Sequence, residues 1–216
     1  MRPSYMAAAF LAIGLVPLVG ALILHATHRT NQARSLPVAT PAGTYRGGTP
    51  PQGVQAPEFS LRSYRGDIVR MRDLRAKVVV VTFLDTKCTD KCPIIASQIG
   101  AALRLLPGSA RRQVGALAIS VDPRADSPAS VRRFLRRRHV LGKLDFLLGS
   151  VRELRPVWHA FHILAAADTG DANIHSADAR IFDRRGIWVT TFHPGVDLTP
   201  RNLAHDLLTA LERSRT

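Results

Sequence analysis

The stretch at residues 83–93 reads FLDTKCTDKCP, and it joins a predicted strand to a predicted helix. The apolar, β-branched run 78–83 leads into it, and such a run is typical of a strand that is buried on both faces of a sheet. Residues 93–106 follow as a predicted helix, with a proline suited to its first turn. Cys88 and Cys92, the two cysteines of the chain, therefore lie in a loop between a buried strand and the start of a helix.

Beyond this stretch, strand and helix signals alternate. Further strands are predicted at 114–121 and 146–148, and hairpins over 59–69 and 179–192. Helices are predicted from caps at Ser127, Ser150 and Thr199 to residues 139, 161 and 211. Buried strands separated by helices imply α/β layers. The order of strand, cysteine pair, helix, closing hairpin and helix is the thioredoxin plan, with a central mixed sheet flanked by helices.

The N-terminal part divides into two segments before this domain. Residues 6–24 contain no charged side chain, and this length suits a helix that crosses a bilayer. We therefore expect an N-terminal membrane anchor at 1–24, or alternatively a signal sequence. Residues 25–56 are rich in proline and glycine, which predicts a flexible linker. The thioredoxin-like domain is expected over 57–216.

The chain is basic, with 30 Lys and Arg against 16 Asp and Glu and a net charge of +14. The densest cluster comprises Arg132, Arg133, Arg136, Arg137 and Arg138. It could attract phosphates or anionic lipid as an electrostatic adaptor, but at helical spacing a solvated helix surface is the favoured interpretation. No aromatic interleaving or nucleic-acid motif accompanies the charge, so nucleic acid is not an expected partner.

The chemistry is expected at the cysteine pair. Two cysteines are too few for a disulfide scaffold or a four-cysteine metal site. The helix N-terminus, together with Lys87 and Lys91, favours the thiolate form of Cys88 and Cys92. At a spacing of four residues the two can form a redox-active disulfide pair, or can both bind one soft metal ion such as Cu(I), with one more ligand needed.

The sequence resembles the Sco/SenC family of copper-binding, membrane-anchored, thioredoxin-like proteins. The resemblance rests on the Cys-x-x-x-Cys-Pro motif and on three further segments: SVDPRADSP at 120–128, LGS at 148–150 and NIHS at 173–176. It covers about residues 54–213 in order. It implies Cys88, Cys92 and His175 as copper ligands, and a domain held outside the cytoplasm. The partners it implies are a copper donor and the copper-accepting subunit of cytochrome c oxidase.

Two functions follow from these residues. The first is a copper metallochaperone that delivers copper to the binuclear copper site of cytochrome c oxidase, a target that the resemblance implies. The second is a thiol–disulfide oxidoreductase that reduces the cysteines of that target without carrying copper. The cysteines have one residue more between them than the usual redox motif, and residues 173–176 lack the proline that redox relatives carry there. Copper binding is therefore favoured, although Lys87 and Lys91 would repel a copper cation.

Overall fold

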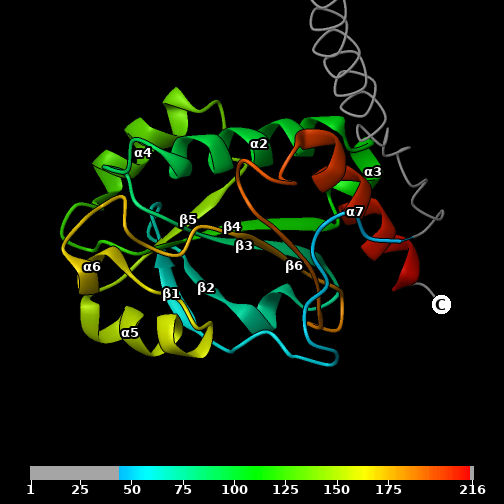
Figure 1. Ribbon diagram of the computed structural model, residues 1–216, viewed down its shortest axis with the longest axis horizontal. Helices are drawn as coiled ribbons and strands as arrows, with labels where there is room; N and C mark the ends of the chain where they lie inside the picture. Colours follow the sequence, from blue (N-terminus) through cyan, green and yellow to red (C-terminus); the bar gives the residue numbers. More distant parts are fainter. Residues whose placement is uncertain (1–43, 215–216) are drawn as a thin grey trace, which may run out of the picture. The chain divides into compact units, whose positions relative to one another are not determined.

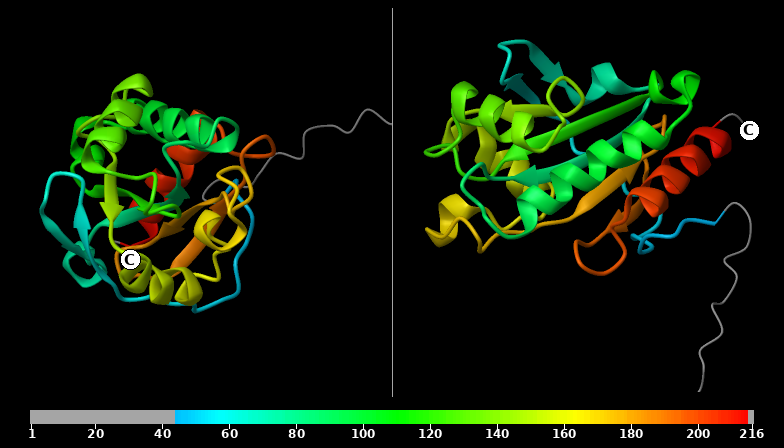
Figure 2. Two further views of the ribbon diagram at one scale, coloured as in Figure 1. Left: turned by 90° about the vertical axis from the view of Figure 1, so that its left-hand side faces the viewer. Right: turned by 90° about the horizontal axis from the view of Figure 1, so that it is seen from above.

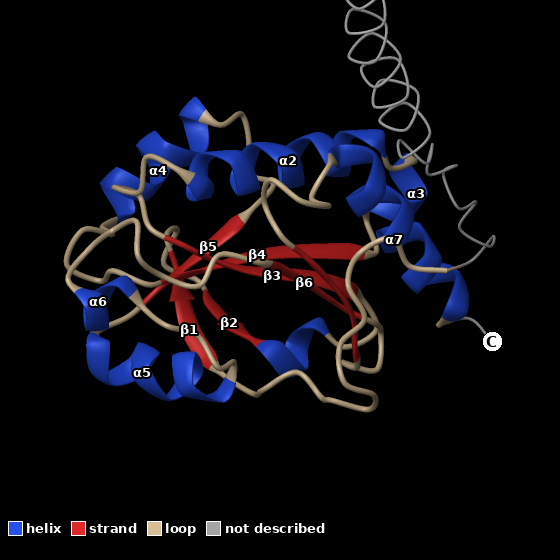
Figure 3. Cartoon of the chain, viewed as in Figure 1, coloured by secondary structure: helices blue, strands red, loops and turns tan. Residues whose placement is uncertain are grey.

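The computed structural model describes residues 44–214 and shows a mixed β-sheet between two layers of helices (Figures 1 and 3). The strand order is β2-β1-β5-β4-β3-β6-β7. β3 and β4 pair in parallel, as do β4 and β5, whereas every other neighbouring pair is antiparallel. The strands are β1 (Ser60–Ser63), β2 (Ile68–Arg70), β3 (Val78–Leu84), β4 (Val114–Ser120), β5 (Asp145–Leu148), β6 (Ala179–Phe182) and β7 (Trp188–Phe192).

Helices α2, α4 and α7 cover one face of the sheet, and α5 and α6 cover the other (Figure 1). The view from above in Figure 2 places α2 and α7 side by side. The long helices are α2 (Lys91–Leu105), α4 (Pro128–Arg137), α5 (Val151–Ala160) and α7 (Pro200–Arg213). Three short helical turns were not predicted: η1 (Met71–Leu74), α3 (Gly108–Arg111) and α6 (Ala166–Thr169).

The predicted central strand is confirmed, since every residue of β3 is buried. Val78 and Val80 pack with α2 and α7, and Val79 and Val81 pack into the opposite layer with α5. This alternation follows from the two-residue period of a strand. Burying each such side chain contributes about 1.5–3 kcal/mol, so β3 is fixed between both layers and holds the loop that follows it.

The predicted helix starts also agree with the structure. Ser150 Oγ accepts the Glu153 N–H at 3.3 Å, and a Glu153 carboxylate oxygen accepts the Ser150 N–H at 2.7 Å. Ser127 caps α4 in the same reciprocal way with Ser130. These bonds satisfy amide groups that have no partner within the helix. Such caps therefore locate the starts of α4 and α5 in the sequence.

The last part of the predicted linker differs from the expectation. The buried carboxylate of Asp206 on α7 accepts the backbone N–H groups of Arg46 and Gly47 at 2.9 and 3.0 Å. Further along, Gly48 pairs with Thr191 of β7. Residues 44–56 therefore belong to the folded unit, which begins before residue 57, because a buried carboxylate needs donors that the preceding chain supplies.

The predicted anchor at 1–24, like the first part of the linker, lies outside the described residues. Within residues 44–214, no helix has both the length and the apolar character that crossing a bilayer requires. The thioredoxin-like arrangement of a mixed sheet with helices on both faces is confirmed over the described chain.

Candidate metal centre

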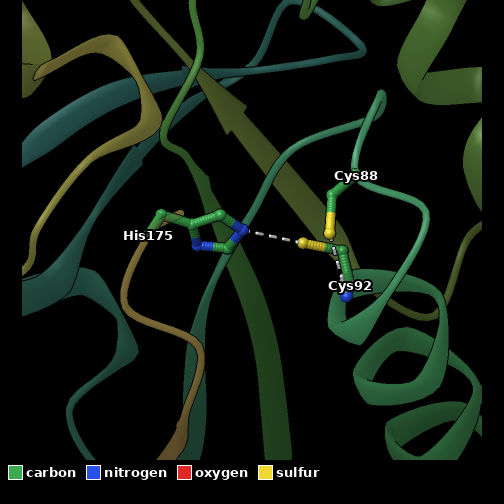
Figure 4. Close-up of side chains that lie close together, drawn as sticks. All are labelled: Cys88, Cys92 and His175. Carbon is green, nitrogen blue, oxygen red and sulfur yellow. Dashed lines mark hydrogen bonds between the residues drawn. The ribbon is translucent and has the colours of Figure 1, made fainter. Parts of the chain in front are cut away.

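Two segments distant in sequence meet at one edge of the sheet. The cysteine loop leaves the C-terminal end of β3, and residues 171–178 lead into the N-terminal end of β6. Because β3 and β6 are antiparallel neighbours, the end of one lies beside the start of the other. Figure 4 shows the result: His175 approaches the two cysteines from the segment before β6, and both sulfurs lie close to its ring.

The structure brings together the three residues that the sequence singles out. Cys92 Sγ lies 3.3 Å from His175 Nε2, and the Cys92 N–H points to Cys88 Sγ at an N–S distance of 3.5 Å. The two sulfurs and one imidazole nitrogen lie within 4.8 Å of one another. Both cysteines are buried and carry free thiols. Across the described chain, this is the single group of three His, Cys, Asp or Glu side chains with metal-binding geometry.

Neighbouring backbone groups orient the imidazole. His175 Nδ1 lies 2.7 Å from the carbonyl oxygen of Ser176. A carbonyl can only accept, so Nδ1 carries a proton and donates it, and Nε2 is the ring nitrogen that faces Cys92. A hydrogen bond of this kind at the second ring nitrogen is a common feature of metal-ligating histidines. Asn173 Oδ1 accepts the Thr89 N–H at 3.2 Å and joins the two segments.

Two buried aspartates support the cysteine loop. Asp126 accepts the Thr86 N–H at 2.9 Å and the Ser120 hydroxyl at 2.6 Å, and burial raises the pKa of Asp126 to about 7. Asp85 accepts the Lys87 N–H at 2.6 Å, and burial raises its pKa as well. Sequence reasoning assigned neither aspartate a role. The hydrogen bond from the Lys87 N–H to Asp85 closes an Asx turn. An aspartate at the start of a loop is typical of such a turn, so this one contact has a signal in the sequence.

The two thiols differ in acidity. Hydrogen bonding from the Cys92 thiol lowers the pKa of Cys88 to about 3, with further donation from His175 and from amides at the start of α2. Hydrogen bonding to Cys88 and burial raise the pKa of Cys92 well above its usual range. Burial alone would lower the pKa of His175, but its hydrogen bonds to the Cys88 thiolate and the Ser176 carbonyl raise it. The metal-free site therefore holds a Cys88 thiolate beside a Cys92 thiol.

Known proteins share this arrangement of sequence and fold. Residues 48–212 match the SCO1/SenC family model. The chain belongs to the SCO1/SenC family. An SCO2-like protein of Rickettsia felis is 24% identical over 199 residues, which cover 89% of this chain and 91% of that protein.

Two solved structures extend the likeness to the fold. The copper-bound ScoI of Bradyrhizobium japonicum is 29% identical with a TM-score of 0.63, and the match covers 73% of this chain and all of that one. BsSco, a Sco family member described as carrying a disulfide switch, is 23% identical with a TM-score of 0.63, over 76% of this chain and 98% of its own. As in these structures, the SCO1/SenC domain here accounts for most of the chain.

The donor set of this SCO1/SenC domain fits a soft metal ion. Thiolate sulfur suits Cu(I), and two sulfurs with one imidazole leave the low coordination number that Cu(I) accepts. The other candidate histidines are not part of the group: His159 near the end of α5 and His162 just after it are both exposed. Cys88, Cys92 and His175 are thus the residues that can hold copper here.

Proposed function

We propose that this protein is a copper metallochaperone. Cys88, Cys92 and His175 would hold one copper ion as cargo and pass it to the binuclear copper site of cytochrome c oxidase. The observation that carries the proposal is the convergence of two sulfurs and one imidazole nitrogen within 4.8 Å. It is supported by the family match and by its relative ScoI of Bradyrhizobium japonicum, whose structure was solved with copper bound.

The protonation state of the site suits the loading of a cation. Cys88 is already a thiolate, because its pKa lies near 3. Cys92 must lose its proton to become a ligand, so loading releases a proton and becomes more favourable as pH rises. His175 presents Nε2 without reorientation, since Ser176 already holds Nδ1.

The position of the ligands suits release as well as binding. Cys88 and Cys92 lie on the loop and first turn that follow β3, whereas His175 lies on a separate segment and is half-buried. An acceptor thiolate can replace one ligand at a time while the other two retain the ion. Such stepwise replacement suits a carrier.

The alternative function is thiol–disulfide exchange with the oxidase cysteines. One observation favours it: Cys88 is a reactive thiolate and Cys92 lies beside it as a resolving thiol. The described disulfide switch of BsSco is consistent with such chemistry in a protein of the same fold. His175 is the feature that this alternative leaves without a role, so copper transfer remains the preferred function.

We further propose that the domain works outside the cytoplasm, held to the membrane through residues 1–24. The uncharged run 6–24 supports this placement. Fractionation of cells that express a tagged full chain, followed by protease digestion of spheroplasts, tests it. A tag at the C-terminus that stays protected from external protease would contradict the proposal.

Copper titration of the full, reduced chain tests the carrier function. We expect one Cu(I) per chain, lost in Cys88→Ser and weakened in His175→Ala. His159→Ala removes an exposed histidine and serves as the matched control. If His175→Ala leaves copper affinity unchanged while Cys88→Ser abolishes disulfide exchange, the oxidoreductase function is the correct one.

A further inference from the structure

A basic pocket of about 480 Å³ lies directly beside the metal centre, between the cysteine loop and α4. Four cationic side chains line it: Lys87, Arg133, Arg137 and Arg138. No acidic residue of the described chain contributes to its wall, and Cys88 does. The volume falls within the range of small-molecule sites, which is about 300–1,000 Å³. The pocket therefore places a strong positive charge beside Cys88.

The arginines of this pocket form no ion pair with the part of the chain that the structure describes. The ion pairs found within residues 44–214 involve none of the three arginines that line it. The Nε atom of Arg138 is buried and has no hydrogen-bond partner among the described residues. Arg133 and Arg137 are four residues apart on α4, a spacing at which like charges repel each other. A bound anion would satisfy the Arg138 donor and relieve this repulsion.

The structure divides the arginine cluster into two groups. Arg132 and Arg136 lie outside the pocket, and Arg132 donates to the carbonyl oxygen of Tyr64 at 3.4 Å. The other three face the cysteine loop across the pocket. The sequence favours a mostly solvated helix surface for these arginines, and four of the five are exposed. Only the fold shows that Arg133 and Arg137 of α4, with Arg138 at its C-cap, line one pocket together with Cys88.

We propose that this pocket binds a small thiol compound bearing carboxylates, and holds its sulfur beside Cys88. Arginine side chains pair with carboxylates through two parallel hydrogen bonds, and three arginines can hold two carboxylates. The proposal rests on the proposed function and deepens it, because both copper exchange and disulfide exchange at Cys88 need an incoming sulfur. Cys88 is only 4% exposed, and the pocket provides a route to it.

The cations of the pocket also favour the approach of an anionic thiol or disulfide. An incoming anionic thiol or disulfide brings a charge that must be balanced at this largely buried site. Lys87 and the pocket arginines supply positive charge around the pocket, which concentrates anions beside Cys88. This gives the lysine beside Cys88 a function that does not involve contact with the copper cation.

The reactivity of Cys88 toward a charged and an uncharged disulfide tests the proposal without any copper. The full chain carrying Cys92→Ser has a single thiol, whose thiolate attacks the reagent disulfide. A mixed disulfide forms with Cys88, and one reagent thiolate leaves and is measured by its absorbance. The dianionic probe is 5,5′-dithiobis(2-nitrobenzoate), and the uncharged probe is 2,2′-dithiodipyridine. The ratio of the two rate constants cancels any change in the intrinsic reactivity of Cys88.

In the pocket variant Arg133→Gln with Arg137→Gln, we expect this ratio to fall about tenfold, at the lower end of what electrostatic attraction supplies. The matched control is Arg132→Gln with Arg136→Gln, which removes the same charge from the same helix and should change the ratio less than twofold. S-methylglutathione, an anion without a free thiol, should slow the dianionic probe alone. An equal fall in both variants, or no competition by S-methylglutathione, would overturn the proposal. Copper titration of the same variants reports separately on the carrier function.

Discussion

Replacing Asp126 by asparagine should change how the stability of the domain depends on pH. Burial raises the pKa of Asp126 to about 7 in the folded chain, from an ordinary value of 3.8. The unfolded chain therefore loses this proton first as pH rises. The stability that the neutral Asp126 carboxyl contributes to the folded chain is fully present below about pH 4. This contribution is lost as pH rises through 7. The interval of about three pKa units corresponds to about 4 kcal/mol.

The variant isolates this contribution because asparagine is neutral at every pH. Its side-chain oxygen can still accept the Thr86 N–H that Asp126 accepts at 2.9 Å. Urea unfolding of wild type and Asp126→Asn from pH 4 to 8 measures the difference. We expect the free energy of unfolding of the variant to rise relative to wild type by up to about 4 kcal/mol over this range. Asp73→Asn removes an exposed carboxylate and controls for the loss of charge.

A difference between Asp126→Asn and wild type that stays constant from pH 4 to 8 would refute this reasoning. It would mean that Asp126 remains ionised in the folded chain, with the Thr86 and Ser120 bonds outweighing its burial. A copper-free sample is needed, because ligand binding adds its own pH dependence to stability.

Three further predictions concern the thiols and the N-terminal segment. Alkylation of Cys88 by iodoacetamide, followed by mass spectrometry, should be nearly constant from pH 5 to 8, because its pKa is about 3; a steep rise toward pH 8 would contradict a preformed thiolate. Cys92→Ala removes the largest cause of that low pKa, so alkylation of Cys88 should then increase with pH over the same range. Gly47→Ala should lower the free energy of unfolding by about 1–3 kcal/mol, since a Cβ there would lie 2.5 Å from a side-chain oxygen of β7. Thermal unfolding measures this change, and Gly48→Ala is the control because its Cβ would meet its nearest atom at 3.6 Å.

The sequence predicts this fold well where local chemistry decides the structure. The β-branched run 78–83 is typical of a strand buried on both faces, and the reciprocal caps at Ser127 and Ser150 set where α4 and α5 begin. The packing of residues 44–56 is different. Proline and glycine there are typical of a linker, and the partner that orders them, Asp206, is about 160 residues away. A contact of that range leaves no local signal in the sequence.

The candidate site divides in the same way. Cys88 and Cys92 are evident from their spacing, whereas His175 was selected among eight histidines through a family resemblance. The supporting role of Asp126 depends on burial and on the loop that lies against it, and neither is visible in a single sequence. The basic pocket depends on which side of α4 faces Cys88, and that is set by tertiary packing.

The distance in sequence between the ligands has a consequence for quality control. Cys88 and His175 are separated in sequence by about half of the domain, and they meet only when β6 has paired with β3. An incompletely folded chain offers the cysteine pair alone and binds a metal ion with fewer ligands. Binding by all three side chains therefore requires that the central sheet has already formed. In return, the bound ion favours the folded over the unfolded chain by mass action.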